Sequence, residues 1–300
     1  MGNLRDLRLR IRAIRQTLQV TKAMNLISTA KLRKGRRMLE DTEPYFTRIQ
    51  KSMFDILSGA GKVKSDFFGN ADPNKPQRTA VVVITSDKGL AGGYNASIFK
   101  QVNELCARVN NPLLILIGNI GHRHFIHSPV TILENFSFRS RMPTVEEAGE
   151  IAEYIVSQYL WGMFNEVHIV YTHMYSSIKR LPCEIQILPL KIEKIQEGLS
   201  AIGSVERVEL HFEYIPSKGA VFDALVPIYI KGMIYGSMVQ SYVSEQSARM
   251  SAMDEASKNA NEMLASLQIK YNRARQASIT QEISEIVGGS TALAERRRTH

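Results

Sequence analysis

The sequence predicts an α/β protein in which two long terminal helices form an antiparallel coiled coil around a small central domain. Residues 3–34 contain no Gly or Pro, residues 237–287 contain none either, and the segment between them alternates apolar β-branched runs with helical patterns. A breaker-free run of 51 residues would make a helix roughly 75 Å long, far longer than an ordinary globular helix. Such a helix needs a partner along its length, and the other end of the chain can supply one.

Positions at heptad spacing recur in both terminal segments, and most of them hold apolar or small residues. They are Leu4, Leu7, Ile11, Ile14, Leu18, Thr21, Asn25, Ser28 and Leu32 in the first segment, and Met253, Ala256, Ala260, Met263, Leu267, Lys270, Ala274 and Ala277 in the second. Small residues let helix backbones approach closely but bury little apolar area, so this seam should be slender and only moderately stable. Two ordinary amphipathic helices are the alternative interpretation.

Five runs between the terminal helices are interpreted as strands, and the first two have the apolar composition of buried strands. They cover residues 80–85, 113–117, 131–138, 166–171 and 184–188, and helical patterns occupy 95–109 and 144–160. Thr144 and Glu147 form a capping-box pair at the start of the second helix. The alternation predicts a parallel or mixed sheet of Rossmann-like type. The expected organisation is a helix at 1–57, a linker at 58–78, the α/β domain at 79–216, a helix at 217–289 and a polar tail at 290–300.

The basic charge of the chain belongs to the first helix. Residues 1–37 carry eleven Lys or Arg residues and one acid, Asp6, which makes +10, whereas the whole chain is +9. Such a helix favours an anionic partner, which could be nucleic acid, anionic lipid or an acidic protein. Residues 1–44 contain no aromatic side chain that could stack on bases, which disfavours single-stranded nucleic acid. A solvated charged face is the neutral alternative.

The two cysteines, Cys106 and Cys183, lie 77 residues apart inside apolar patterns. This predicts buried free thiols and a reducing compartment. No apolar run approaches 18 residues, so no membrane span is expected. The N-terminus is rich in Arg and poor in acids, as transit peptides are, but its heptad continues without a break, so we expect it to be mature structure.

The glycine-rich loop at residues 86–95, SDKGLAGGYN, follows the first strand where a dinucleotide-binding loop would lie. Its Gly89, Gly92 and Gly93 are spaced G-x-x-G-G rather than G-x-G-x-x-G. The second strand ends in Gly118 and Asn119, where a ribose-binding acid would be needed. A tight turn is therefore the simpler interpretation.

Other candidate chemical sites are incomplete. Residues 58–62, SGAGK, lack the first Gly and the final Ser or Thr of a phosphate-binding loop. His122, His124 and His127 have no carboxylate or Cys at ligand spacing. Asp87 and Lys88 lack a third catalytic partner. We therefore expect no catalytic, cofactor-binding or metal site in this chain.

Four segments, in this order, resemble the gamma subunits of F-type ATP synthases. They are LRLRIRAIRQTLQVTKAMNLISTAKLRK at 7–34, SDKGLAGGYN at 86–95, SEQSARMSAMDEASKNANEM at 244–263 and ARQASITQEISEIVGG at 274–289. The resemblance covers essentially the whole chain, with Ala91 where the family often has Cys. It implies a non-catalytic rotor whose coiled coil stands inside a hexamer of alpha and beta subunits. The α/β domain would rest with an epsilon subunit on the membrane c-ring.

The resemblance also implies which residues couple rotation to catalysis. The matching positions are Met24, Lys31, Arg33, Lys34, Glu245, Arg249, Arg275, Gln276, Thr280 and Glu282, followed by an apolar tip of Ile279, Ile283, Ile286 and Val287 that Gly288 and Gly289 should end. ATP, ADP and Mg²⁺ would bind to partner subunits and not to this chain. The implied location is the cytoplasmic face of a bacterial plasma membrane, in a peripheral complex without nucleic acid. A Rossmann-type enzyme with helical arms and a polyanion-binding coiled coil are the alternatives.

Overall fold

The computed structural model describes residues 2–58, 63–69, 77–136, 142–176, 179–192 and 214–298, without the side chains of 2–3 and 291–298. The chain divides into two compact units. Unit 1 comprises Met1–Ile27 and Met250–His300, and unit 2 comprises Ser28–Arg249. Helices α1 (Gly2–Ser58) and α6 (Lys218–Arg298) each contribute residues to both units. No helix of the described residues is long and apolar enough to cross a bilayer.

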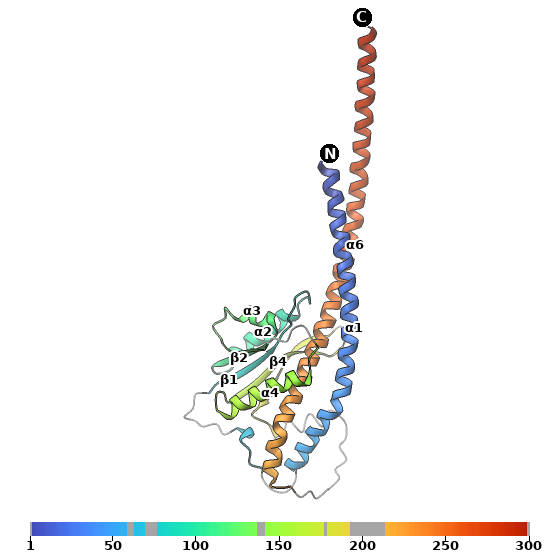
Figure 1. Ribbon diagram of the computed structural model, residues 1–300. Coiled ribbons are helices and arrows are strands. Elements are labelled where there is room, and N and C mark those ends of the chain that lie inside the picture. Colours follow the sequence, from blue (N-terminus) through green and yellow to red (C-terminus); the bar gives the residue numbers. More distant parts are fainter. Residues whose placement is uncertain are drawn as a thin grey trace. The chain divides into compact units, whose positions relative to one another are not determined.

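In unit 1, α1 and α6 pack as an antiparallel pair. Arg8 Nη2 donates to the Tyr271 hydroxyl at 2.7 Å, Thr21 Oγ1 lies 2.8 Å from Ser257 Oγ, and Asn25 Nδ2 donates to the Met250 carbonyl at 3.0 Å. Partner numbers fall along α6 as they rise along α1, so the two helices run in opposite directions (Figure 1). The predicted antiparallel pairing of the chain ends is therefore confirmed.

The α6 side of the seam differs from the prediction by one residue at three positions. Met253, Ala260 and Leu267 are buried as expected, but Met263 is 51% exposed, and Lys270 and Ala277 are exposed. Leu264, Tyr271 and Ser278, each one residue later, are half-buried instead, whereas Ala256 and Ser257 are both half-buried. After Met253 and Ala260, apolar or small residues stand both three and four positions later, so the spacing there did not separate the two registers. Contact of Tyr271 with Arg8, whose guanidinium carbon lies 5.7 Å from the ring centroid, selects the second register.

Helix α6 continues beyond its contact with α1. Arg8 is paired with Tyr271, and α1 begins only six residues before Arg8, so α6 has no α1 residue beside it after about residue 278 (Figure 1). The helix runs through Gly288 and Gly289 to Arg298, so the prediction that these glycines end it was wrong. Glycine ends a helix by adopting positive φ, and neither of these two does so. A glycine that keeps helical dihedral angles costs only about 1 kcal/mol relative to Ala.

Unit 2 contains a five-stranded mixed sheet. Its order is β3-β2-β1-β4-β5, formed by β1 (Thr79–Ile84), β2 (Pro112–Ile117), β3 (Thr131–Phe136), β4 (Glu166–Met174) and β5 (Arg180–Leu188). The first four strands run parallel and β5 is antiparallel to β4. The predicted mixed α/β sheet is therefore confirmed, and residues 137–138 of the third predicted strand lie outside the described residues.

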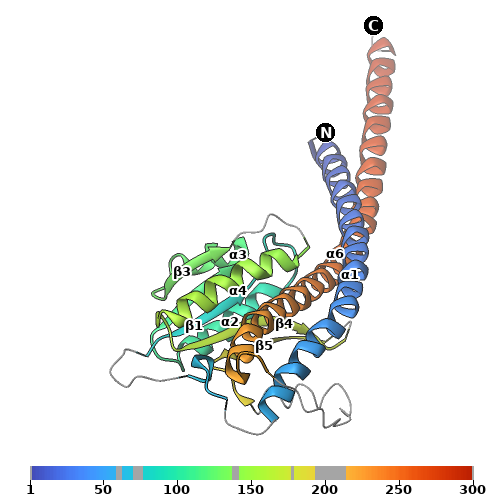
Figure 2. The same cartoon turned by 60° about the horizontal axis from the view of Figure 1, so that its bottom comes forward.

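Helices cover both faces of this sheet. Helices α2 (Tyr94–Cys106) and α3 (Asn119–Phe125) pack with one face through a core that includes Val83, Leu116 and Ile98. Helix α4 (Val145–Leu160) lies with α6 over the other face (Figure 2). The capping box is present, because Thr144 Oγ1 accepts from Glu147 N at 3.2 Å and Glu147 Oε2 accepts from Thr144 N at 3.0 Å. One 3₁₀ turn, η1 (Asp66–Phe68), stands in the predicted linker.

The unit 2 halves of α1 and α6 approach closely at two glycines. A Cβ at Gly35 would lie 2.7 Å from Val243 Cγ2, and a Cβ at Gly232 would overlap the Phe46 ring and lie 2.9 Å from its Cγ. Both distances are shorter than van der Waals contact. Gly35 on α1 and Gly232 on α6 therefore permit this helix spacing, and each helix continues through its proline, Pro44 in α1 and Pro227 in α6.

Candidate interaction site

The first candidate surface is the end of α6. Its apolar residues Ile279, Ile283, Ile286 and Val287 are 46–72% exposed, and Arg275, Gln276, Thr280 and Glu282 between them are exposed as well. At about 100° per residue, these eight positions occupy one half of the helix circumference. A contiguous exposed apolar stripe with polar neighbours marks a surface that binds a partner. The structure thus brings the predicted tip residues and the predicted polar contacts onto one stripe, called here the tip stripe.

Hydrogen bonds within the helix hold some polar groups of the tip stripe. Thr280 Oγ1 donates to the Gln276 carbonyl at 2.9 Å, and Ser278 Oγ donates to Glu282 Oε1 at 3.3 Å. These contacts link neighbouring turns, so the hydroxyl of Thr280 and the carboxylate of Glu282 keep defined positions on the helix surface. The tip stripe therefore offers a guanidinium, an amide, a hydroxyl and a carboxylate beside apolar side chains, which suits directed polar contacts around an apolar centre.

The second candidate surface is the basic face of α1. All eleven Lys and Arg side chains of residues 1–37 are exposed, including Lys31, Arg33 and Lys34. Met24 is half-buried, and the apolar side chains of Leu26 and Ile27 that follow it are exposed. Exposed cations beside exposed apolar groups suit an acidic protein surface.

Glu245 and Arg249 are placed differently from the other predicted contact residues. Their side chains are only 15% and 10% exposed, and Arg249 Nη2 lies 2.6 Å from Glu245 Oε1. The same nitrogen donates to the main-chain carbonyls of Lys88 at 3.1 Å and Gly89 at 3.2 Å. Burial raises the pKa of Glu245 above its ordinary value, Arg249 and Lys31 oppose that shift, and Asp87 adds to it. Both residues are thus engaged within their own chain.

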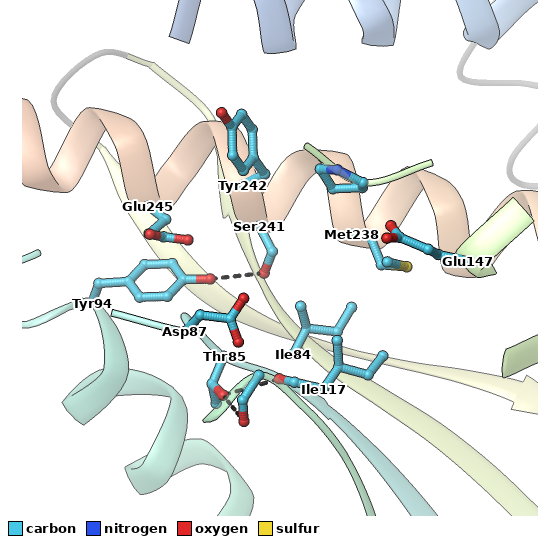
Figure 3. Close-up of a pocket in the computed structure, with 12 residues that line it drawn as sticks. Ile84, Thr85, Asp87, Tyr94, Ile117, Glu147, Met238, Ser241, Tyr242 and Glu245 are labelled. Atoms are coloured by element: carbon cyan, nitrogen blue, oxygen red, sulfur yellow. Dashed lines mark hydrogen bonds between the residues drawn. The ribbon is translucent and has the colours of Figure 1, made fainter. Parts of the chain in front are cut away.

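The glycine-rich loop meets α6 at the carboxyl edge of the sheet. The cavity there measures about 60 Å³ and is lined by residues of the loop, the strand ends and α6, among them Thr85, Asp87, Tyr94, Ser241 and Glu245 (Figure 3). Small-molecule sites usually measure about 300–1,000 Å³, so a dinucleotide does not fit. Gly118 has φ +99 and packs so closely on Thr85 that a Cβ would lie 2.8 Å from its Oγ1. Helix α6 fills the crevice in which an open parallel sheet would bind its ligand.

Sequence reasoning missed the polar attachment of α6 to this edge. Ser241 Oγ accepts from the Tyr94 hydroxyl at 3.0 Å and from Thr172 N at 3.2 Å, and Ser244 Oγ donates to the Thr172 carbonyl at 3.0 Å. Burial raises the pKa of Tyr94 strongly, so its hydroxyl stays a donor. The signal was present in the sequence, because serines at 237, 241, 244 and 247 keep three-or-four spacing on an otherwise apolar stretch.

The remaining candidate residues serve packing. The His124 ring stacks on Phe99 with centroids 3.8 Å apart, and His127 lies beyond the end of α3. Cys106 and Cys183 are free thiols and half-buried, and burial raises the pKa of Cys106. No group of three or more His, Cys, Asp or Glu side chains in the described ranges could hold a metal ion. Most of the 58–62 segment lies outside the described residues.

Comparison with known proteins finds one family along nearly the whole chain. A family model described as ATP synthase matches residues 3–293. The ATP synthase gamma chain of Acetivibrio thermocellus is 43% identical over 98% of this chain and 100% of the relative. The sodium-ion-specific gamma chain of Acetobacterium woodii is 36% identical over 97% and 99%.

Solved structures share the fold at low identity. A chain of the Euglena gracilis mitochondrial ATP synthase has a TM-score of 0.69 at 18% identity, covering 97% of this chain and 95% of that one. A chain of the Tetrahymena thermophila central stalk and c-ring has a TM-score of 0.59 at 22% identity, covering 79% and 99%. The chain therefore belongs to the ATP synthase gamma chain family, the non-catalytic central-stalk subunits of F-type ATP synthases.

Proposed function

We propose that this central-stalk subunit turns inside a hexamer of alpha and beta subunits and transmits the rotation of a membrane ring to three catalytic sites. One observation carries the proposal: the tip stripe is exposed, and from Ile279 onward it lies on a length of α6 that α1 does not accompany. A single helix can be surrounded by other subunits on every side, which a shaft requires. An apolar stripe on one half of it makes the shaft asymmetric, so subunits around it meet different faces.

The shaft acts through differences in contact energy. A catalytic subunit that meets the tip stripe in one orientation and a polar face in another is biased toward different conformations. The coupling is reciprocal in free energy, so nucleotide hydrolysis in the hexamer can turn the shaft in the opposite direction. The contacts at any one angle have to be modest, because a deep energy minimum would stop rotation.

The proposal assigns residues to partners. Arg275, Gln276, Thr280 and Glu282 contact loops of the beta subunits, and Ile279, Ile283, Ile286 and Val287 lie in an apolar sleeve formed by the top of the hexamer. Met24, Lys31, Arg33 and Lys34 face acidic levers of the beta subunits, for which the exposed basic face of α1 is the supporting observation. The family resemblance assigns Glu245 and Arg249 to a lower contact of the same kind, but we do not extend the proposal to them, because their side chains are only 15% and 10% exposed and are paired with each other.

The α/β domain of unit 2 is proposed to rest on the c-ring together with an epsilon subunit. The similar Tetrahymena chain comes from a central stalk solved with its c-ring, and it supports this arrangement by analogy. ATP, ADP and Mg²⁺ bind to the partner subunits, and the complex lies on the cytoplasmic face of the membrane.

Reconstitution tests this proposal. The chain is mixed with cognate alpha and beta subunits, a bead is attached to the α/β domain, and bead rotation is followed during ATP hydrolysis. We expect steps of one third of a turn. A stable hexamer whose ATPase activity and orientation are independent of the chain would contradict the shaft role.

A variant of the tip stripe tests the residue assignments. Arg275→Ala should lower turnover or coupling while the complex still assembles, because a single transient contact is removed. The exposed Lys258, which pairs with Asp254 at 2.9 Å on the same helix, provides a matched control as Lys258→Gln. Complete loss of assembly with Arg275→Ala alone would show that the contact is structural rather than transient.

A further inference from the structure

Arg249 holds the glycine-rich loop of the α/β domain onto α6. Its guanidinium lies between the carboxylate of Glu245, one turn earlier on the same helix, and two consecutive main-chain carbonyls of the loop, those of Lys88 and Gly89. We propose that Arg249, oriented by Glu245, is a positioning residue that locks the α/β domain to the shaft helix so that torque passes between them without slip. The arrangement of Glu245, Arg249 and the carbonyls of Lys88 and Gly89 is called here the clasp.

The geometry of the clasp suits this role. A guanidinium is planar, always charged and able to donate several hydrogen bonds in fixed directions. Its bonds to Lys88 and Gly89 go to main-chain atoms, so they fix the path of the loop whatever side chains the loop carries. Glu245 supplies the negative charge that a buried arginine needs. Removal of the arginine would therefore free the loop and leave a buried carboxylate without its counterion.

The base of the loop is attached firmly to the sheet. Ser86 N donates to Asn95 Oδ1 at 3.1 Å, and Asn119 N donates to Asp87 Oδ1 at 3.0 Å. The segment between these attachments contains Leu90 at φ +64, an unfavourable conformation for a side chain other than Gly or Asn. The loop backbone is therefore strained at Leu90, and the hydrogen bonds of the clasp help to hold it in that conformation. Since one side of the loop is tied to the sheet and the other to α6, a movement of the domain has to be followed by the helix.

The position of the clasp along α6 adds to the argument. Arg249 is the last residue of α6 in unit 2, and Met250 is the first in unit 1, while the helix itself continues without interruption. Before Arg249 in the chain, Ser241 and Ser244 attach the helix to Tyr94 and Thr172. The clasp is therefore the last of a series of attachments before the helix leaves the domain, where a twisting load would concentrate.

Burial distinguishes this role from a contact with another subunit. A side chain that is 10% exposed presents little surface to a partner. The inference rests on the proposed rotor function only for its consequence, the transmission of torque. The existence of the clasp itself can be tested in the isolated full-length chain.

The first measurement is hydrogen exchange of the full-length chain in peptides that cover residues 86–95. Arg249→Gln should raise exchange there by about tenfold, because two charge-assisted hydrogen bonds are lost. Glu245→Gln keeps the arginine and should raise exchange less. The double variant Glu245→Gln/Arg249→Gln leaves no unpaired buried charge, so it should fold even if Arg249→Gln alone does not, and it should show the same loop exchange.

The second measurement is the number of ions pumped per ATP hydrolysed by the reconstituted synthase. Arg249→Gln and the double variant should lower this ratio by about twofold or more, while ATP hydrolysis continues. Lys258→Gln is the matched control, since it breaks an exposed ion pair with the same four-residue spacing on the same helix. It should change neither loop exchange nor the pumping ratio.

Two results would overturn the inference. Unchanged exchange of residues 86–95 in both arginine variants would show that Arg249 does not hold the loop. Raised exchange with an unchanged pumping ratio would show that the clasp exists but carries no torque. Failure of the rotor proposal is recognised separately, because in that case the wild-type chain itself would have no effect on ATP hydrolysis or pumping.

Discussion

Two glycines one turn apart on α6 should respond oppositely to the same substitution. Replacing glycine by alanine inside a helix gains about 0.8–1.0 kcal/mol of helix propensity. At Gly236 no atom lies within 4 Å of the added Cβ, so Gly236→Ala should stabilise the protein by about that amount. At Gly232 the Cβ would overlap the Phe46 ring, and overpacking of this kind costs about 1–3 kcal/mol. Both variants gain the same helix propensity. The difference between their free energies of unfolding therefore measures the cost of the overlap alone, about 1–3 kcal/mol.

The Phe46 ring has little room to move away. Its centroid lies 5.2 Å from that of Tyr45 and 6.1 Å from that of Tyr235, so a rotation would disturb aromatic contacts on both sides. Thermal unfolding of the full-length variants should place the melting temperature of Gly232→Ala below that of Gly236→Ala by about 2 °C or more. Hydrogen exchange in peptides covering residues 40–50 and 228–240 should locate the loss at this contact. Equal stability of the two variants would show that α1 and α6 are not in close contact at Gly232.

Three further predictions concern the seam, a helix cap and alkaline pH. Leu267→Ala should destabilise unit 1 by about 2–4 kcal/mol because the side chain is buried. Met263→Ala should cost less than about 0.5 kcal/mol because that side chain is exposed. Chemical unfolding of both variants tests the seam register. Thr144→Ala removes the capping box of α4 and should cost about 1 kcal/mol, measured by thermal unfolding against Ser157→Ala, whose hydroxyl bonds only the Tyr154 carbonyl. Burial raises the pKa of Tyr229 to about 12 and strongly raises that of Tyr94. The folded protein holds these protons more tightly than the unfolded chain does. Their contribution to the free energy of unfolding should therefore be constant below about pH 10 and fall as pH rises from 10 to 12. Tyr229→Phe should make that fall shallower in unfolding curves measured at pH 8, 10 and 11.

The features that followed from the sequence are those decided by local pattern. Uninterrupted apolar runs place β1 and β2 to within a residue, since a strand buried on both faces needs such a run. Thr144 and Glu147 define the start of α4, because a capping box involves only four consecutive residues. The pairing of the chain ends followed from helix length, because a helix so long needs a partner.

The features that did not follow from the sequence depend on atoms distant in the chain. The seam register was set by Tyr271 meeting Arg8, 263 residues away. The buried position of Glu245 and Arg249 depends on a loop some 160 residues earlier, so their charges alone suggested a surface contact. The two glycines at 288 and 289 end a helix only if their dihedral angles change, and nothing local forces that change. Likewise, the boundary between the two units falls between residues 27 and 28 in α1 and between residues 249 and 250 in α6, where no change of composition marks it.

Helix α6 meets a different environment in each part of its length, and this explains why one helical period does not describe it. Residues such as Phe222, Val226 and Ile230 are fully buried in unit 2, the serines from 237 to 247 form polar attachments, and small residues form the seam after Met253. The last turns carry the exposed tip stripe. The 81 residues of α6 thus contribute both to the α/β domain of unit 2 and to the tip stripe of unit 1. Under the proposed rotor function, a rotation of the α/β domain is transmitted along α6 only if α6 cannot turn within that domain, so the attachments up to Arg249 are as important for coupling as the tip stripe.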